Sequence, residues 1–525
     1  MRKALSVLAI FVTASAAPWL SGCSSTATST NQIQPPPASS VPVSLTMTDD
    51  PPAGVSVLFF QVSLTAASLQ PTSGSPVSLL PNGTSIQIDV TKLQALSAFL
   101  STANVPAGSY SGLSLTFANP QLVIFNTSDQ SIASTCAVGS VCQLTPAIDN
   151  SATVALSGNP FPVTVAANTP LGLLIDYHLN TIIQPDLSVN LSAANGVSVA
   201  PLVPPSAPLQ PPQFGFLTGT VESVSADQTQ FTVQTAWGRT FTIDTNSSTV
   251  HVDWPPCASP GALSCLSAGT VVQVQIASVE SNGDLLAAQV TWLQAAGQQT
   301  VVGAIVAIPP LPLPAGETVL LVMLHQNPTA STSLPVGAVA QVAVWGPGSG
   351  GGHSVTTFSI DSNGFNIPSG FTFASPNDLG VGQTVQITVT PGTLTGPVCT
   401  TVITANGWGP PCVLSFTASG LQLEPSQITG TIASIGSGSF GLNTFPNIFL
   451  GPWSPNAVPN NGLIVETTSQ TTYQGFSPDN FSGLADNDLV SVSGWVFPQN
   501  GALTPAVGPP IVVAQTITLH PNAVY

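Results

Sequence analysis

Asp176 and His178 are the two residues whose types and spacing most directly suggest chemistry. They stand two positions apart in the segment Leu174-Ile-Asp-Tyr-His178, which has the composition of a β-strand. Alternate side chains of a strand project from one face, so both are expected on the same side of a sheet. A carboxylate beside an imidazole is two-thirds of a hydrolytic triad, and one hypothesis is therefore a secreted hydrolase that uses Asp176 and His178.

The same two residues also fit a structural role. A hydrogen-bonded histidine and an aspartate in a turn or core give the same pattern. The chain has no Gly-x-Ser-x-Gly segment that would supply a nucleophile. The structural interpretation is favoured, so the sequence predicts that the protein is not an enzyme.

An acidic cluster near the C-terminus is the best candidate for a metal site. Asp479, Asp486, Asn487 and Asp488 supply oxygen ligands of the kind that Ca²⁺ prefers. The EF-hand spacing is absent, and Asp and Asn also favour turns before strands for backbone reasons. The turn is the favoured interpretation, and neither a metal nor a cofactor is expected. The other histidines are isolated and form no metal-ligand spacing: His251, His325, His353 and His520.

Four tryptophans stand beside glycine or proline, where turns are expected: Trp237, Trp254, Trp408 and Trp453. An exposed indole on a rigid loop is a stacking platform for a sugar ring or another protein. The favoured alternative is that each ring folds back to cover the end of a small barrel core. The four residues are therefore candidates for ligand stacking, with a packing role as the other hypothesis.

The N-terminus has the layout of a bacterial export signal. A basic start, Met1-Arg2-Lys3, precedes an apolar stretch over Ala4–Ala17 that is too short to span a membrane. The following Leu20-Ser-Gly-Cys23 resembles the bacterial lipobox. That resemblance implies cleavage before Cys23, lipid attachment to its sulfur and anchoring in the envelope, with Ser24 favouring the outer membrane. A secreted chain with an ordinary cleavage site is the alternative.

Cysteine spacing agrees with export. Six cysteines follow Cys23, and none has the spacing of a zinc site. Close pairs in an exported chain predict disulfide bonds that staple loops, whereas buried free thiols are the alternative. The predicted pairs are Cys136 with Cys142, Cys257 with Cys265, and Cys399 with Cys412.

Charge excludes one class of partner. Only 5% of the 525 residues are charged, whereas soluble proteins average about 25%. Beyond residue 3 the basic residues are Lys92 and Arg239, against 21 acidic residues. Because nucleic-acid binding depends on neutralising phosphates with Lys and Arg, nucleic acid is excluded as a partner, as is docking to an anionic membrane surface. The 43% apolar content argues against disorder.

Short alternating strands separated by turn residues predict an all-β protein. Strands are expected around Val43–Met47, Val55–Leu64, Ile86–Val90 and Leu113–Phe117, with one short helix over Lys92–Ser101. The predicted organisation is a signal peptide with lipobox (1–23), a Ser/Thr/Pro tether (24–40), an N-terminal β domain (41–200), a Pro-rich linker (201–213) and three repeats (216–295, 300–424 and 426–521).

The repeats are visible as echoed segments. Leu217-Thr-Gly-Thr-Val-Glu-Ser-Val224 returns as Ile428-Thr-Gly-Thr-Ile-Ala-Ser-Ile435 and more loosely as Val301-Val-Gly-Ala-Ile-Val-Ala-Ile308. The glycine in each opening strand suits a sharp bend or bulge, which lets a small sheet curl into a barrel. The fold class predicted is therefore an N-terminal β-sandwich-like domain followed by three small, OB-like β-barrels.

Two family resemblances follow from these motifs. Leu45-Thr-Met-Thr-Asp-Asp-Pro51, Ile88-Asp-Val-Thr-Lys-Leu93, Val105-Pro-Ala-Gly-Ser-Tyr110 and Leu174-Ile-Asp-Tyr177 resemble the bacterial lipoprotein domain-of-unknown-function family 4382. The repeats resemble the small β-barrel domain-of-unknown-function family 5666, the middle one with an insertion over Gly346–Gly352. Neither resemblance implies a mechanism.

Taken together, the sequence predicts a non-catalytic cell-envelope protein. It would be anchored by the lipid on Cys23, and it would bind an envelope glycan or protein or serve as a surface scaffold. The hydrolase of the first hypothesis is the alternative.

Overall fold

The computed structural model describes residues 40–50, 57–81, 83–93, 98–125, 141–147, 153–184, 187–202, 214–252, 254, 262–309, 315–326, 334–347, 354–362, 364–398, 413–443, 462–498 and 510–519. The predicted signal peptide and nearly all of the tether lie outside these residues. So do the candidate residues Cys23, Cys136, Cys257, Cys399, Cys412, Trp408 and Trp453. None of the described helices has the length and apolar character needed to cross a bilayer.

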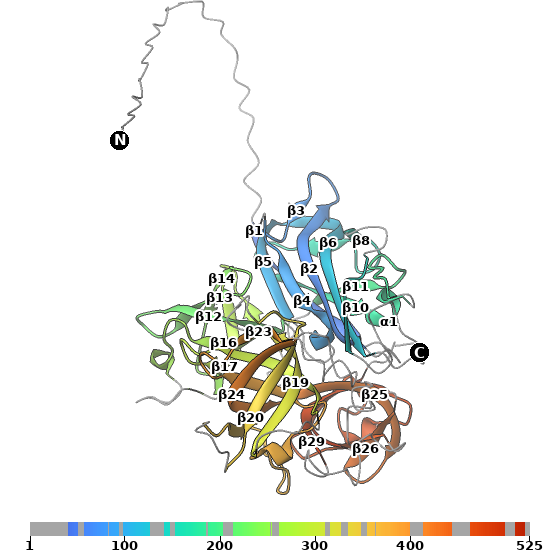
Figure 1. The fold of residues 1–525 in the computed structure, drawn as a ribbon. Coiled ribbons are helices and arrows are strands. Elements are labelled where there is room, and N and C mark those ends of the chain that lie inside the picture. The colour runs from blue at the N-terminus through green and yellow to red at the C-terminus, as the bar shows by residue number, and fades with distance from the viewer. Residues whose placement is uncertain are drawn as a thin grey trace, which may run out of the picture. The chain divides into compact units, whose positions relative to one another are not determined.

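The fold is all-β, as predicted (Figure 1). Helical structure in the described part of the chain amounts to one four-residue helix, α1 (Leu179–Ile182), and short 3₁₀ turns. The strands form four sheets. One contains four strands of the N-terminal domain together with the strands of the first barrel, a second contains the remaining strands of the N-terminal domain, and the other two form the second and third barrels.

Two sheets of the N-terminal domain enclose its core. In the first, the strand order is β11 (Val197–Leu202), β10 (Leu171–His178), β1 (Ser40–Asp50) and β5 (Ala98–Pro106). The second contains β3 (Val77–Ser78), β2 (Val57–Pro71), β6 (Gly108–Phe125) and β7 (Val141–Leu144), with β4 (Ile86–Asp89) on β2 and β8 (Thr153–Leu156) and β9 (Val163–Val165) on β6. Phe117 and Tyr177 meet edge to face across this core, with ring centroids 5.8 Å apart. The two sheets therefore pack face to face around one core, as in a β-sandwich.

The strand predictions for this domain are confirmed. The alternating run at Val43–Met47 lies in β1, and the run Leu113–Phe117 lies in β6. The denser apolar run lies in β2, whose residues from Val57 to Leu64 are all buried. Continuous burial shows that both faces of this strand are covered, which explains why its sequence does not alternate.

The helix predicted over Lys92–Ser101 is wrong. A 3₁₀ turn, η1 (Val90–Leu93), is followed by strand β5, which begins at Ala98. Phe99 is buried in the core of the first barrel, whereas Leu100 is buried in the N-terminal core. Burial of consecutive side chains on opposite faces requires a strand, and pairing with β1 outweighs the weak helical spacing of the leucines.

Each of the three repeats forms a ring of five strands. The first ring runs β12 (Phe216–Val224), β13 (Gln230–Thr235), β14 (Thr240–Asp244), β17 (Leu285–Gln294), β16 (Val271–Val279) and back to β12. The second runs β18 (Thr300–Ala307), β19 (Glu317–Gln326), β20 (Val339–Trp345), β24 (Val413–Glu424), β22 (Thr384–Val389) and back to β18, with β23 (Thr395–Val398) added on β24.

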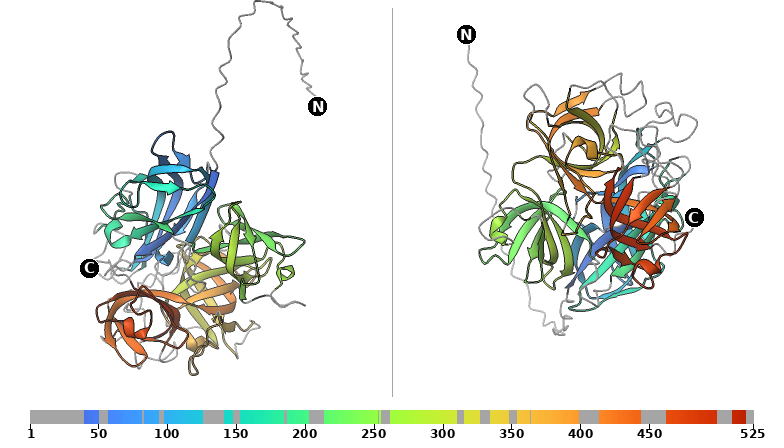
Figure 2. Two further views of the ribbon diagram at one scale, coloured as in Figure 1. Left: turned by 180° about the vertical axis from the view of Figure 1, so that it is seen from behind. Right: turned by 90° about the horizontal axis from the view of Figure 1, so that it is seen from below.

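The third ring runs β25 (Ser426–Ile435), β26 (Ser439–Asn443), β27 (Leu463–Glu466), β30 (Ile511–Leu519), β29 (Leu489–Phe497) and back to β25. A short extra strand pairs in parallel with the last strand of each ring: β15 (Val250–Val252), β21 (Thr357–Ile360) and β28 (Thr472–Gln474). The left view of Figure 2 shows the third ring, coloured orange to red. Ring closure in the order first, second, third, fifth and fourth strand matches the five-stranded OB-like barrel predicted.

The glycine of each opening strand occupies a position with no room for a side chain. A Cβ atom on Gly219 would lie 2.5 Å from the carbonyl oxygen of Gln234, and one on Gly430 would lie 2.8 Å from that of Asn443. Gly303 of the second barrel meets the carbonyl of Met323 in the same way. In all three barrels, the opening strand therefore approaches its neighbour as closely as only glycine permits.

A β-bulge follows each glycine at the same offset. The register of the first hairpin shifts between Val221 and Ser223 in the first barrel and between Ile432 and Ser434 in the third. The second barrel shifts between its equivalent residues, Ile305 and Ala307. A bulge bends the strand and increases its twist. The predicted bend at the glycine is thus realised as a close approach followed by a bulge.

Replacing Gly430 by alanine is expected to destabilise the third barrel by about 1–3 kcal/mol, because the new methyl group overlaps the carbonyl of Asn443. Hydrogen–deuterium exchange over β25 and β29 of the full chain would measure this. Gly396→Ala is the matched control, since a Cβ there meets nothing within 4 Å. Equal exchange in the two variants would contradict the steric account.

Candidate functional site

Asp176 and His178 lie on one face of β10, as the sequence predicts. Leu173, Ile175 and Tyr177 of this strand are fully buried in the N-terminal core. The two polar residues alternate with them and are half-buried on the other face. The prediction of a shared face is therefore confirmed, and the face points away from the core.

Both residues belong to a paired strand of the sheet. Asp176 is opposite Thr48 of β1 and Ser198 of β11, in the middle of three paired strands. The backbone N–H of His178 donates a 2.9 Å hydrogen bond to the carbonyl of Gly196, and the residue directly precedes α1. These contacts support the structural interpretation, while the hydrolytic role stays a prediction.

Trp237 and Trp254 are both packed against apolar cores. The ring of Trp237 lies against side chains of the N-terminal core and of the first-barrel core. Trp254 packs on the first-barrel core, and its Nε1–H donates a 3.0 Å hydrogen bond to the carbonyl of Ala262. This packing favours the alternative in which the rings cover a core. Stacking of a ligand on either of them stays a prediction.

The acidic cluster of the third barrel is built around a turn that recurs in the other two. Asn487 has a positive φ of 72°, and its N–H donates to the carbonyl of Ile432 over 2.8 Å. Gly269 and Gly382, with φ values of 88° and 90°, make the same bond to the bulge residue of their own opening strands. Asparagine is the residue other than glycine that most readily adopts this conformation. The turn interpretation therefore explains Asn487 without a metal.

The carboxylate of Asp488 has a partner in the same turn. Its Oδ2 accepts a 2.8 Å hydrogen bond from the N–H of Ala485. Gln383 plays this part in the second barrel, where its Oε1 accepts from the N–H of Gly380 over 2.7 Å. Asp479 and Asp486 are exposed, and no group of three His, Cys, Asp or Glu side chains suited to a metal occurs among the described residues.

Two of the cysteines predicted to form disulfides fall within the described residues. Cys142, on β7, and Cys265, on a 3₁₀ turn of the first barrel, are both disulfide-bonded. Their predicted partners lie outside the described residues, as does the third pair, so the three pairings stay predictions.

His251 is a titratable side chain whose pKa is lowered by its surroundings. It lies on β15, and its ring meets that of Trp254 with centroids 4.4 Å apart. Burial lowers its pKa, and its Nε2 is buried without a hydrogen-bond partner. A histidine held in this way favours the neutral form. The sequence shows only an isolated histidine, since the neighbouring ring contact depends on the fold.

The outer face of the first barrel is composed of hydroxyl, amide and carboxylate side chains. Strand pairing sets Thr220 opposite Gln234 and Gln234 opposite Thr240, with Thr232 opposite Thr242 in the row two residues along. These five side chains are exposed or half-buried, whereas the alternating residues of the same strands form the core.

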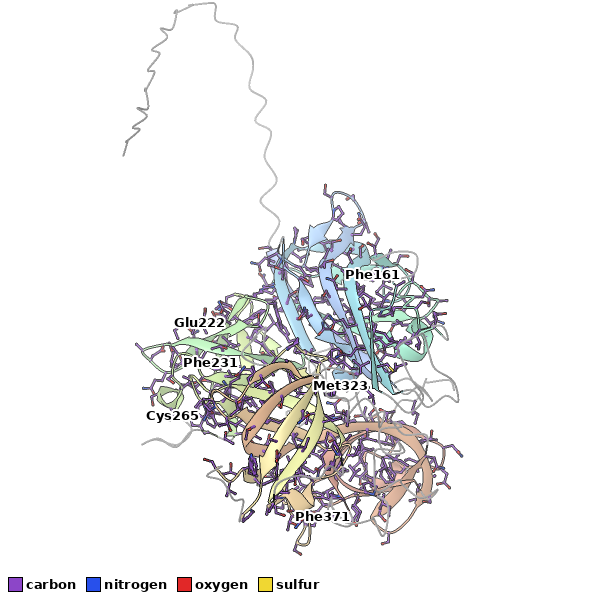
Figure 3. The ribbon with its side chains drawn as sticks, in the orientation of Figure 1. Phe161, Glu222, Phe231, Cys265, Met323 and Phe371 are labelled. Carbon is purple, nitrogen blue, oxygen red and sulfur yellow. The ribbon has the colours of Figure 1, made fainter. Side chains whose placement is uncertain are left out.

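Glu222 extends this polar face. It is exposed, and its Oε2 accepts a 3.0 Å hydrogen bond from the hydroxyl of Thr240. Figure 3 labels Glu222 together with Phe231, which is buried in the core of the same barrel. These strands thus have an apolar inner face and an outer face on which hydrogen-bonding groups predominate.

The equivalent face of the second barrel is apolar and covered. Register places Leu321, Met323 and Val339 where the first barrel has Thr232, Gln234 and Thr240. These three side chains are buried in one cluster with Leu58, Phe59 and Val123 of the N-terminal domain. The same barrel surface therefore packs against protein in one repeat and presents polar groups in another.

Sequence reasoning did not identify these outer residues. Thr and Gln at alternating strand positions are ordinary solvent-facing residues, and nothing in the sequence distinguishes them. The distinguishing feature is the register across strands, which places equivalent residues of different barrels in the same position. Only the pairing in the structure supplies it.

Asp488→Ala is expected to destabilise the third barrel by about 1 kcal/mol, because the N–H of Ala485 loses its acceptor. Excess Ca²⁺ or EDTA should leave the melting temperature of the wild-type chain unchanged. A rise with Ca²⁺ that the variant lacks would instead identify the carboxylate as a metal ligand.

Lowering the pH is expected to weaken the first barrel through His251. Because burial lowers its pKa, the unfolded chain binds a proton more readily than the folded chain. Stability from this residue is full above about pH 6.5, the ordinary histidine value, and falls as the pH drops toward the folded pKa. Thermal melts of the wild type and His251→Gln across this range test the point. Parallel profiles would contradict it.

Comparison with known protein families agrees with the resemblance of the N-terminal domain and with that of the first and third repeats, and gives no match over the middle repeat. Residues 40–193 match the family described as Domain of unknown function (DUF4382). Residues 218–291 and 429–504 each match Domain of unknown function (DUF5666). No curated protein is similar to the chain. The chain thus contains one DUF4382 domain and two DUF5666 domains, and the latter are the first and third barrels.

Proposed function

We propose that the protein is a lipid-anchored, non-catalytic binding protein of the bacterial cell envelope. The observation that carries the proposal is the difference between barrel surfaces. Three barrels share one strand topology, and in the first the outer face of β12, β13 and β14 is an exposed array of polar groups. In the second barrel, the same face is buried against protein. A barrel face that packs against a partner in one repeat is a reasonable binding surface in another.

The polar and aromatic side chains that stand out in the sequence support a binding role more than a catalytic one. Asp488 accepts a hydrogen bond that shapes a turn, and Trp237 and Trp254 are packed against cores. In the OB-like barrel, the second and third strands and the adjoining loops are the usual surface for oligosaccharides and oligonucleotides. With two basic residues beyond residue 3, the chain favours a saccharide over a nucleic acid.

Lipid anchoring rests on the Leu20-Ser-Gly-Cys23 segment. A chain carrying several acyl groups is held firmly by a membrane, and each buried CH₂ contributes about 0.8 kcal/mol. Anchoring would hold the barrels at the envelope, where glycans are abundant.

Cell fractionation tests the anchoring. Wild-type protein is expected in the membrane pellet, from which detergent releases it, and Cys23→Ala protein is expected in the soluble fraction because no lipid can be attached. Ser24→Ala is the matched control and should remain in the pellet. If the Cys23→Ala variant also remains there, anchoring by lipid is wrong.

Binding is tested by co-sedimentation of the detergent-solubilised full chain with insoluble polysaccharide prepared from the same cell envelopes. The chain should sediment with the polysaccharide, and a denatured sample should not. A chain that stays in the supernatant at every polysaccharide concentration would overturn glycan binding.

A further inference from the structure

The first and third barrels carry the same kinds of polar group at several register-equivalent positions, although Gly441 and Ile464 of the third barrel stand where the first has Thr232 and Thr242. In the first, Thr220 pairs with Gln234, and in the third, Thr431 pairs with Asn443. In both pairs the threonine directly follows the opening glycine, so the backbone fixes their equivalence. In each pair, the threonine is half-buried and the amide is exposed.

Two further positions agree. An exposed serine follows the bulge in both barrels, Ser223 in the first and Ser434 in the third. At the far end of the second hairpin, Asp244 of the first barrel corresponds to Glu466 of the third. Both acids are half-buried at the end of the third strand of the ring. Hydroxyl, amide and carboxylate thus recur in one arrangement.

The second barrel departs from this arrangement at the same positions. Ala304 replaces the threonine, Met323 replaces the amide and Ala343 replaces the carboxylate. The first and third barrels therefore have polar groups at positions where the second has apolar residues, of which Met323 packs against the N-terminal domain. Equivalent chemistry on two separate surfaces indicates a shared ligand, because the barrel fold itself tolerates apolar residues there.

The spacing of these groups suits a polyhydroxyl chain. Side chains of paired residues are about 5 Å apart, and the carboxylate, which pairs with the residue four positions from the amide, lies about 13 Å along the strand. Hydroxyl groups both donate and accept, amides do so through separate atoms, and carboxylates only accept. Sugar hydroxyls require both donors and acceptors, which these groups supply together.

Charge indicates which glycans fit. Neither face contains a lysine or arginine, and each contains a carboxylate, Asp244 or Glu466. Arg239 is engaged elsewhere: its guanidinium donates to the carbonyl of Thr102 and lies 4.7 Å from the ring centroid of Phe241. Uronic or sulfated sugars would meet negative charge without a cation to pair with. An uncharged glycan would not be repelled by these carboxylates.

We propose that the outer faces of the first and third barrels are two equivalent binding sites for one uncharged glycan chain. This inference rests on the proposed glycan-binding function and adds the sites and the ligand class. Two sites on one chain bind a polymer with an avidity that exceeds either single affinity.

Affinity electrophoresis of the detergent-solubilised full chain provides the test. The gels would contain hydroxyethyl cellulose or dextran as uncharged polysaccharides, or heparin as an anionic one. Gln234→Ala and Asn443→Ala are each expected to weaken retardation about 2–10-fold, the effect of losing one hydrogen bond. The double variant should lose about 4–100-fold, because the losses at the two sites of a bivalent chain multiply. Gln275→Ala on β16, outside both faces, is the matched control.

The possible results test the two proposed sites and the proposed glycan-binding function separately. Wild-type retardation that the double variant retains would place glycan binding elsewhere and overturn the two sites while leaving the proposed function intact. A wild-type chain that neither uncharged polysaccharide retards would overturn both. Retardation in heparin alone would overturn the choice of an uncharged ligand. Unchanged melting temperatures of the variants would confirm that each loss reflects binding.

Discussion

The close approach of two backbones at one glycine is the constraint on which the barrels depend. In each ring, the opening strand comes so near to the second strand that a Cβ atom would meet a carbonyl oxygen, as at Gly219 and Gly430. The bulge that follows re-aims the strand, and its bulge residue then exchanges backbone hydrogen bonds with the turn before the fourth strand. Ring closure is therefore largely a property of the backbone.

Because the backbone and the inner residues maintain the ring, the outer residues are free to vary. Thr232 in the first barrel and Leu321 in the second occupy the same position in the ring, yet one faces outward among polar groups and the other is buried. Changing these side chains changes what the barrel contacts without changing the barrel. A repeated domain can in this way supply one surface that packs within the chain and others that bind a ligand.

Much of the fold follows from the sequence because it depends on local patterns. Alternation placed β1 and β6, and the echoed glycine segments indicated three barrels with a bend in each opening strand. The helix prediction for the segment around Phe99 is wrong because the two faces of this strand are buried in different cores, and local spacing does not reveal that. Trp237 is ambiguous for a related reason, since an indole beside a glycine looks the same whether it meets solvent or two cores.

The candidate site is harder to predict from the sequence than the fold. Asp488 is a candidate metal ligand in the sequence because carboxylates bind cations, but in the structure it accepts a hydrogen bond that completes a turn. Gln234 and Asn443 are not recognisable as candidates in the sequence, because single amides on strands are common. Their equivalence emerges only when strand register aligns them with Thr220 and Thr431. A binding surface built from common polar residues on several strands therefore leaves no motif in the sequence.

Hydrogen–deuterium exchange of the full chain with saturating soluble cello- or dextran-derived oligosaccharide tests the central claim most directly. Glycan binding at both polar faces predicts slower exchange in β13 and β14 of the first barrel and in β26 and β27 of the third. The covered strands β19 and β20 should be unaffected. Equal exchange with and without the oligosaccharide in all six strands, or protection confined to β19 and β20, would contradict the account.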